Sequence, residues 1–192
     1  MPNTLSPNTS ALVLIDLQRG VTALDLRPRP ASEIVASASA LARSFRAVGA
    51  PVVLVRVTYR ADGADRVAPL PGQPAPGAPA RDFSLPDPGL HTEPSDLLVS
   101  KHQWGAFYGT DLDLLLRRNR VDTVVVAGIA THMGVESTVR EAWERSYRVM
   151  VAEDATGAPS EEDHRHSTER VFRRIATVTS CAEVTGALTG SG

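Results

Sequence analysis

Two charged residues stand at the ends of apolar runs, where their side chains could perform acid–base chemistry. Asp16 ends the run that begins at Ala11, Gln18 lies two residues further on, and Lys101 follows a second run. A carboxylate beside a buried strand must be paired or hydrogen-bonded to stay charged, and a nearby ammonium group would form a proton-transfer pair with it. Asp16 and Lys101 are therefore candidate catalytic residues. A capping aspartate and a solvated lysine are the alternative interpretations.

A third segment, residues 128–134, could bind negative charge through its backbone. It reads Gly-Ile-Ala-Thr-His-Met-Gly and lies between an apolar run and a helix expected to begin near Val135. The N–H groups at a helix N-terminus favour an anion or a developing oxyanion, and an ordinary strand-to-helix turn is the alternative. The segment lacks the Gly-Lys-Ser/Thr of a phosphate loop and the three-glycine spacing of a dinucleotide site. Neither kind of nucleotide site is predicted.

Other residues that could carry chemistry favour structural roles. His164 and His166 are two positions apart on an expected helix and point to different faces, so a solvated helix is favoured over a metal site. Cys181 follows the weakest expected strand and is interpreted as a structural thiol. The Gly-Xaa-Ser-Xaa-Gly elbow of serine hydrolases does not occur. The aromatic residues after Lys101 either belong to the core or wall an apolar pocket: Trp104, Phe107 and Tyr108.

The elements that must position these residues alternate between apolar runs typical of buried strands and stretches of helical periodicity. Strands are predicted over residues 11–16, 51–57, 96–100, 123–127, 148–152 and 176–180. Helices are predicted over residues 31–48, 111–119, 135–146 and 160–174. This order predicts a three-layer, Rossmann-like α/β domain, with about six strands in a mostly parallel sheet and helices on both faces. Ligands bind outside the carboxyl ends of such strands, where Asp16 and Lys101 fall.

Length and composition indicate a single domain over residues 1–192, interrupted by a proline- and glycine-rich loop at about residues 60–95. A loop of this length is typical of a lid, an oligomer arm or a mobile segment. The formal net charge of -2 gives no reason to expect nucleic acid or a membrane as a partner. One cysteine, a polar stretch from Met1 to Ser10 and the lack of an apolar run of about 18 residues favour a cytoplasmic protein.

Three motifs together resemble the isochorismatase-like hydrolase superfamily, which has a cysteine hydrolase-type fold, over nearly the whole chain. They read ALVLIDLQ at residues 11–18, KHQWGAF at residues 101–107 and VVVAGIATHMGVEST at residues 124–138. The resemblance implies that Asp16 is the catalytic aspartate and Lys101 the catalytic lysine. Gly134 stands where amidases of the superfamily place the nucleophilic cysteine. It therefore marks a vacated nucleophile position, where no thioester intermediate can form.

The same resemblance implies a set of substrate-binding residues: Gln18, Trp104, Phe107, Ile129, Ala130, His132 and Met133. Isochorismatases proper match the chain at Gly134 and at His132, but Ala130 stands where they have a tyrosine and Gln103 where they have an arginine. The histidines with which nicotinamidases bind metal are missing from residues 58–64, so neither a metal nor a cofactor is expected.

Two structural features are also implied by the resemblance. The peptide bond between Ile129 and Ala130 is expected to be cis, a bend that aims the amides of the turn into the pocket. The protein is expected to form a homodimer or a larger homo-oligomer, for which the loop at about residues 60–95 could serve as an arm.

Together these inferences predict hydrolysis of a small-molecule substrate, such as a vinyl ether or an amide, without a cysteine nucleophile. Asp16 would move the proton, Lys101 would hold charge on the substrate or the aspartate, and residues 129–134 would bind developing negative charge. One alternative is a catalytically inactive homologue that binds a small molecule or has a regulatory role. Another is a hydrolase that uses Cys181.

Overall fold

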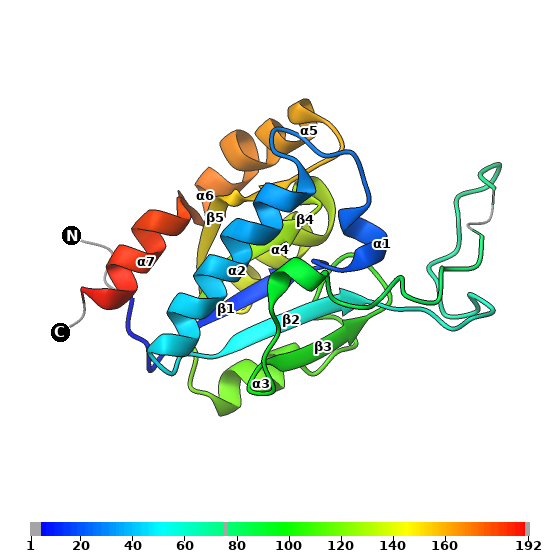
Figure 1. Ribbon diagram of the computed structural model, residues 1–192. Coiled ribbons are helices and arrows are strands. Elements are labelled where there is room, and N and C mark those ends of the chain that lie inside the picture. Colours follow the sequence, from blue (N-terminus) through cyan, green and yellow to red (C-terminus); the bar gives the residue numbers. More distant parts are fainter. Residues whose placement is uncertain (1–4, 75–76, 191–192) are drawn as a thin grey trace.

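Six parallel strands form the central sheet of the computed structural model, which describes residues 5–74 and 77–190 (Figure 1). The strands are β1 (Ser10–Ile15), β2 (Val52–Val57), β3 (Leu97–Lys101), β4 (Thr123–Ile129), β5 (Arg148–Gly157) and β6 (Thr177–Thr179). They lie in the order β3-β2-β1-β4-β5-β6, and every neighbouring pair is parallel. Strands β1 and β4 are buried at every position, which explains why their sequences are continuously apolar.

Helices cover both faces of the sheet (Figure 1). The main α-helices are α2 (Ala31–Ala47), α3 (Leu112–Arg118), α4 (Glu136–Glu144), α5 (Glu161–His166) and α7 (Cys181–Thr189). The other helical segments are α1 (Arg19–Thr22), η1 (Pro88–Leu90), η2 (Thr131–Val135), η3 (Ser167–Phe172) and α6 (Arg173–Ile175). Alternate residues of β1 point to opposite faces: Leu12 and Leu14 pack with α2 and α7, whereas Val13 and Ile15 pack with α3 and α4. The predicted three-layer α/β fold is confirmed.

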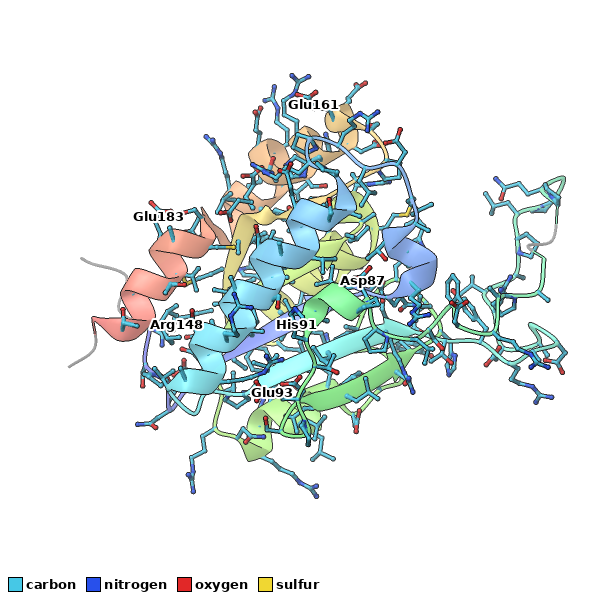
Figure 2. The ribbon with its side chains drawn as sticks, viewed as in Figure 1. Asp87, His91, Glu93, Arg148, Glu161 and Glu183 are labelled. Carbon is cyan, nitrogen blue, oxygen red and sulfur yellow. The ribbon has the colours of Figure 1, made fainter. Side chains whose placement is uncertain are left out.

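Some element boundaries differ from those predicted. The helix predicted over residues 160–174 consists of α5, η3 and α6 in succession, and β5 continues past residue 152 to Gly157. Helix α7 was not predicted, although Ser180 and Glu183 form a capping box at its start, which is a local helix signal. Figure 2 places Glu183 on the outer side of this helix.

The segment between β2 and β3 contains the expected long loop, interrupted by the short helix η1. Part of it, which we call the arm (residues 61–74 and 77–82), leaves the carboxyl end of β2 and extends away from the sheet and helices (Figure 1). Within residues 5–74 and 77–190, no helix is both long and apolar enough to cross a membrane.

Candidate active site

Asp16 is the first residue after β1, where the backbone turns sharply. Its φ is +53°, in the left-handed region that aspartate enters more readily than most residues. Its N–H donates to Val55 O at 2.9 Å, so the residue stays fixed beside β2. Only 7% of Asp16 is exposed. The turn therefore holds a buried carboxyl group at the carboxyl end of the sheet.

Gly128 lets β4 lie close to this turn. It pairs with Ile15, the residue before Asp16, at a φ of +126°. A Cβ at this position would lie 2.1 Å from Ile15 O, so a side chain would force the two strands apart.

Lys101, the last residue of β3, reaches Asp16 across the end of β2. Two interstrand spacings, roughly 10 Å, separate β3 from β1, so a long side chain is needed. Lys101 Nζ donates to Asp16 Oδ2 at 2.7 Å and to Trp104 O at 2.6 Å. Lys101 is the only lysine in the sequence and is 1% exposed. Each partner compensates the other's burial, because an unpaired charge would be costly there.

Asp16 retains a tendency to hold a proton. Burial raises its pKa to about 6, against the opposing charge and hydrogen bond of Lys101. Oδ2 accepts from Lys101, whereas Oδ1 is buried and has no hydrogen-bond partner among the described residues. A proton on this carboxyl group belongs on Oδ1, because Oδ2 faces the ammonium group. The carboxyl group can therefore exchange a proton with a molecule bound beside Oδ1.

Gly134 lies against this pair. An ideal Cβ on Gly134 would be 3.0 Å from Asp16 Oδ2 and 3.2 Å from Lys101 Nζ, so any side chain here would touch both charged groups. The structure thus brings together the three residues predicted to be catalytic, although their roles remain a hypothesis. With glycine at this position, no nucleophilic atom is attached at the point of contact.

The turn that carries this glycine is η2, a single π-helical turn (Thr131–Val135) between β4 and α4. The peptide bond between Ile129 and Ala130 is cis, which confirms the prediction for this bond. The N–H groups of Met133 and Val135 donate to Ala130 O at 3.0 and 3.2 Å. These two amides are therefore engaged within the turn and do not face a ligand.

A buried chain of polar groups supports the start of the turn, and sequence reasoning missed it. Thr131 Oγ1 lies 3.0 Å from His164 Nδ1, and His164 Nε2 lies 2.7 Å from Glu153 Oε1. Hydrogen bonding from His164 and then the charge and hydrogen bond of Arg29 lower the pKa of Glu153 to about 2, against the effect of burial. The ionised carboxylate accepts the Nε2 proton, and Nδ1 lies beside the Thr131 hydroxyl.

Gln18, predicted to bind substrate, is hydrogen-bonded to backbone groups in this structure. Its Nε2 donates to Val57 O at 2.9 Å and to Phe83 O at 3.0 Å, and its Oε1 accepts from Val57 N at 2.8 Å. The amide is thus occupied by backbone groups, and Gln18 is 1% exposed. Gln18 ties the end of β2 to the base of the arm, because a carboxamide can replace the ladder bonds that end there.

Phe107, also predicted to contact substrate, lies in the core of the structure. It is buried in the apolar core beneath the sheet, against Tyr147 with ring centroids 5.9 Å apart. The side chain of Ile129 is likewise buried in the core, on the face that carries α2, with Ala130 and part of Met133 packed there. The substrate-binding roles of Ile129, Ala130 and Met133 stay predictions.

His132 and Trp104 are better placed to meet a ligand. His132 Nδ1 is buried without a hydrogen-bond partner among the described residues, and Nε2 lies 3.8 Å from Asp163 Oδ2. Trp104 is 59% exposed and lines a cavity. The substrate-binding roles of both remain predictions.

The cavity that Trp104 lines has a volume of about 1110 Å³ and lies between the base of the arm, residues 102–105 and α4. Asp16, Lys101 and Gly134 do not line it. Tyr59 connects the two regions: it lines the cavity, and the charge of Asp16 contributes to the raised pKa of its phenol, after burial as the larger cause. Tyr59 follows β2 by two residues, so the rule that selected Asp16 would also have selected it.

No group of three or more potential metal-ligating side chains gathers anywhere in the described part of the chain. His164, one of the two histidines weighed as metal ligands, is instead 4% exposed and bonded to Thr131 and Glu153. It lies in the structural interior, not on the solvated face that the sequence suggested.

Comparison with known proteins places the chain among relatives over almost its full length. A family model described as the isochorismatase domain matches residues 10–183. The isochorismatase family protein YecD of Escherichia coli O157:H7 is 45% identical over 96% of this chain and 98% of its own.

Solved structures agree with this assignment. An isochorismatase family protein from Burkholderia thailandensis is 41% identical, with a TM-score of 0.92 over 97% of this chain and 98% of the other. N-carbamoylsarcosine amidase from Thermoplasma acidophilum is 29% identical, with a TM-score of 0.72 over 90% of this chain and 96% of the other.

Proposed function

This chain belongs to the isochorismatase family, and from that premise we propose that it hydrolyses a small metabolite by proton transfer at Asp16, without a cysteine nucleophile. One observation carries the proposal: a buried carboxyl group with a pKa of about 6 is held through Oδ2 by Lys101, while Oδ1 stays unpartnered. Such a group is suited to general acid–base catalysis near neutral pH.

The first step is proton donation from Asp16 Oδ1 to the substrate. In a vinyl ether the proton goes to the terminal alkene carbon, and the carbon that bears oxygen becomes an oxocarbenium ion. In an amide the proton goes to the leaving nitrogen as water adds to the carbonyl carbon. Lys101 stabilises the Asp16 carboxylate that results, because it lies 2.7 Å from Oδ2.

Water completes the reaction. It attacks the electron-poor carbon and returns a proton to the Asp16 carboxylate, which restores the starting state. For a vinyl ether, the hemiketal then breaks into a carbonyl compound and an alcohol. For an amide, the carbon–nitrogen bond of the tetrahedral intermediate breaks, which releases the amine and leaves a carboxylic acid. The first amides of a helical turn have no acceptor within it, so the N–H groups of Thr131 and His132 are the proposed donors to developing negative charge.

Both substrate classes have support. The glycine at position 134 leaves no covalent route, which suits vinyl ether hydrolysis because protonation at carbon followed by water addition needs no nucleophile on the protein. The likeness to N-carbamoylsarcosine amidase supports hydrolysis of a carbon–nitrogen bond.

The test measures turnover of isochorismate and of a panel of simple vinyl ethers, ureido compounds and amides by the purified protein. Wild type should turn over at least one of them, and Asp16→Asn should lower kcat by about 10²- to 10⁴-fold with an unchanged circular dichroism spectrum. Asp25→Asn, an exposed carboxylate between α1 and α2, is the matched control.

Alkylation distinguishes this proposal from chemistry at Cys181. Iodoacetamide treatment, followed by mass spectrometry to confirm modification of the sole thiol, should leave turnover intact. Loss of turnover in proportion to Cys181 modification, or Asp16→Asn with full activity, would overturn the proposal. If no substrate in the panel reacts and ligand binding survives in Asp16→Asn, the chain is a binding homologue that lacks catalysis.

A further inference from the structure

Strand β5 bulges beside the candidate active site. From Val126 to Gly128, β4 advances two residues, whereas β5 advances five along the same stretch, from Val151 to Thr156. Extra residues in one strand bend it locally and redirect its side chains, and such bulges are common next to active sites. Glu153 lies within this bulge. Its carboxylate contacts side chains that lie outside the sheet.

Both carboxylate oxygens of Glu153 are held in place. Arg29, which precedes α2, donates to Oε1 at 3.2 Å and to Oε2 at 3.3 Å. His164 on α5 places Nε2 2.7 Å from Oε1, and its other ring nitrogen lies 3.0 Å from Thr131 Oγ1. Because both ring nitrogens are engaged, the imidazole cannot turn without losing a hydrogen bond. The bulge therefore fixes the Thr131 side chain through His164.

Thr131 is the first residue of η2, and its side chain binds outside that turn. Within the turn, the N–H groups of Met133 and Val135 bind Ala130 O. The Thr131 side chain is 0% exposed, and its hydroxyl bonds to His164 on α5. The last residue of η2 leads directly into α4. The turn is thus tied to the rest of the protein at both of its ends.

The same turn covers the Asp16–Lys101 pair. An ideal Cβ on Gly134, which is buried, would lie 3.0 Å from Asp16 Oδ2 and 3.2 Å from Lys101 Nζ. The ionisable side chains that neighbouring elements bring to Asp16 are Lys101 from β3 and Tyr59 after β2, and η2 itself carries His132. Burial is the largest influence on the Asp16 carboxyl group. The position of η2 therefore controls how much water reaches that group.

We infer that His164 is a positioning residue that holds the η2 turn over Asp16 and Lys101. It acts through Thr131, and Glu153 fixes its ring. A role in stability alone does not explain three linked polar groups, because apolar side chains of the same shape would fill the space without a desolvation cost. Hydrogen bonds add direction, which sets where the turn lies. The consequence for catalysis, that the turn keeps water from the Asp16 carboxyl group, rests on the proposed function.

An NMR titration of the Asp16 carboxyl group tests this positioning without a substrate. The protein is labelled with ¹³C-aspartate, and the Asp16 resonance is assigned by its absence from Asp16→Asn. In wild type the titration should give a pKa of about 6. Thr131→Val keeps the shape of the side chain and removes the hydroxyl, so water should reach the carboxyl group and the midpoint should fall by about one pH unit. Thr131→Ser keeps the hydroxyl and should titrate like wild type.

Thr123→Val is the matched control. Thr123 is buried at the other end of β4, where its hydroxyl donates to Asp122 Oδ1 at 2.6 Å, and its loss should not move the Asp16 midpoint. His164→Leu should lower the midpoint as Thr131→Val does. The double variant should lower it no further than the larger single change, because both substitutions remove the same hydrogen bond. If His164→Leu does not fold, Thr131→Val and Thr131→Ser still decide the result.

Turnover gives a second readout. At pH values above both midpoints, kcat/KM of Thr131→Val should be about tenfold below that of wild type, because the protonated fraction of Asp16 falls in that proportion. An unshifted Asp16 midpoint in folded Thr131→Val, or an equal shift in Thr123→Val, would overturn the inference and leave catalysis by Asp16 untouched. If wild type turns over no substrate but the midpoint shifts as expected, His164 keeps its positioning role and the proposed function fails.

Discussion

At the residue scale, Asp16 combines two opposing influences on one carboxyl group. Burial raises its pKa and Lys101 lowers it, and the balance stands at about 6. A fully exposed aspartate would be ionised throughout the neutral range, and one buried without Lys101 would hold its proton too firmly to act as a base afterwards. In the Asp16–Lys101 pair, the carboxyl group can therefore both donate and regain a proton near neutral pH.

The pH dependence of turnover follows from this balance. Because donation requires protonated Asp16, kcat/KM should fall as pH rises through about 6. Lys101→Met removes the positive charge that lowers this pKa, so the falling limb should move to higher pH even though the maximum rate drops. If the falling limb of the kcat/KM profile lay at the same pH in Lys101→Met as in wild type, Asp16 would not be the proton donor. Arg117→Met, a half-exposed cation on α3, should leave the profile unchanged.

Gly134→Cys tests the geometry of the site without requiring a substrate. The new thiol would attach where a Cβ lies 3.2 Å from Lys101 Nζ, and the nearby positive charge favours the thiolate. Burial and Asp154 raise the pKa of Cys181, so residue 134 should be alkylated faster than Cys181. The measurement is iodoacetamide modification across pH, assigned by mass spectrometry.

Two comparisons interpret that result. Asp16→Ala in the same background serves as the control, because it removes the neighbouring carboxyl group and should change the pH dependence of alkylation. A folded Gly134→Cys variant whose thiol reacts no faster than Cys181 would contradict the geometry. A variant that fails to fold indicates instead that the 3.0 Å approach to Asp16 Oδ2 requires glycine.

At the element scale, the central strands were predictable because each is buried on both faces and therefore reads as a continuous apolar run. Asp16 and Lys101 were found by the same logic, as polar residues at strand ends. Long-range partners were not predictable: the bonds that join Thr131, His164 and Glu153 come from three separate elements. The sequence also predicted a solvated helix around His164, because helical periodicity indicates a helix but not which of its faces packs against the rest of the protein.

The hydrogen bonds that join Thr131, His164 and Glu153 should make the free energy of unfolding depend on pH in the acid range. The folded-state pKa of Glu153 is lowered from 4.5 to about 2, so its contribution is present above pH 4.5 and is lost as pH falls from there toward 2. We expect Glu153→Gln to lower the free energy of unfolding by about 1–3 kcal/mol at pH 7, because His164 loses a charged acceptor, and the difference from wild type should shrink toward pH 2.

Urea denaturation at a series of pH values measures this difference. Glu161→Gln is a suitable control, because Glu161 is exposed at the outer end of α5 (Figure 2). The stabilising role of ionised Glu153 would be contradicted if Glu153→Gln and wild type had the same free energy of unfolding at pH 7. It would also be contradicted if the difference between them stayed constant down to pH 2.

At the scale of the whole molecule, the sheet and its helices bury the core on both faces, whereas the arm buries almost nothing. The sequence indicated a long proline-rich loop, and it could not indicate where the loop would lie, since its prolines fix local backbone angles without specifying a partner. The homo-oligomer that the family resemblance implied stays a prediction.

The burial of Lys101 also makes the protein a reporter of its own opening. Since no other lysine occurs in the sequence, an amine-directed acylating reagent can modify only the α-amino group and this one side chain. Modification of Lys101, at 1% exposure, requires a local opening that separates it from Asp16. The rate at which the intact protein gains the mass of this modification would therefore report how often the site opens. A ligand that holds the pocket closed would lower that rate.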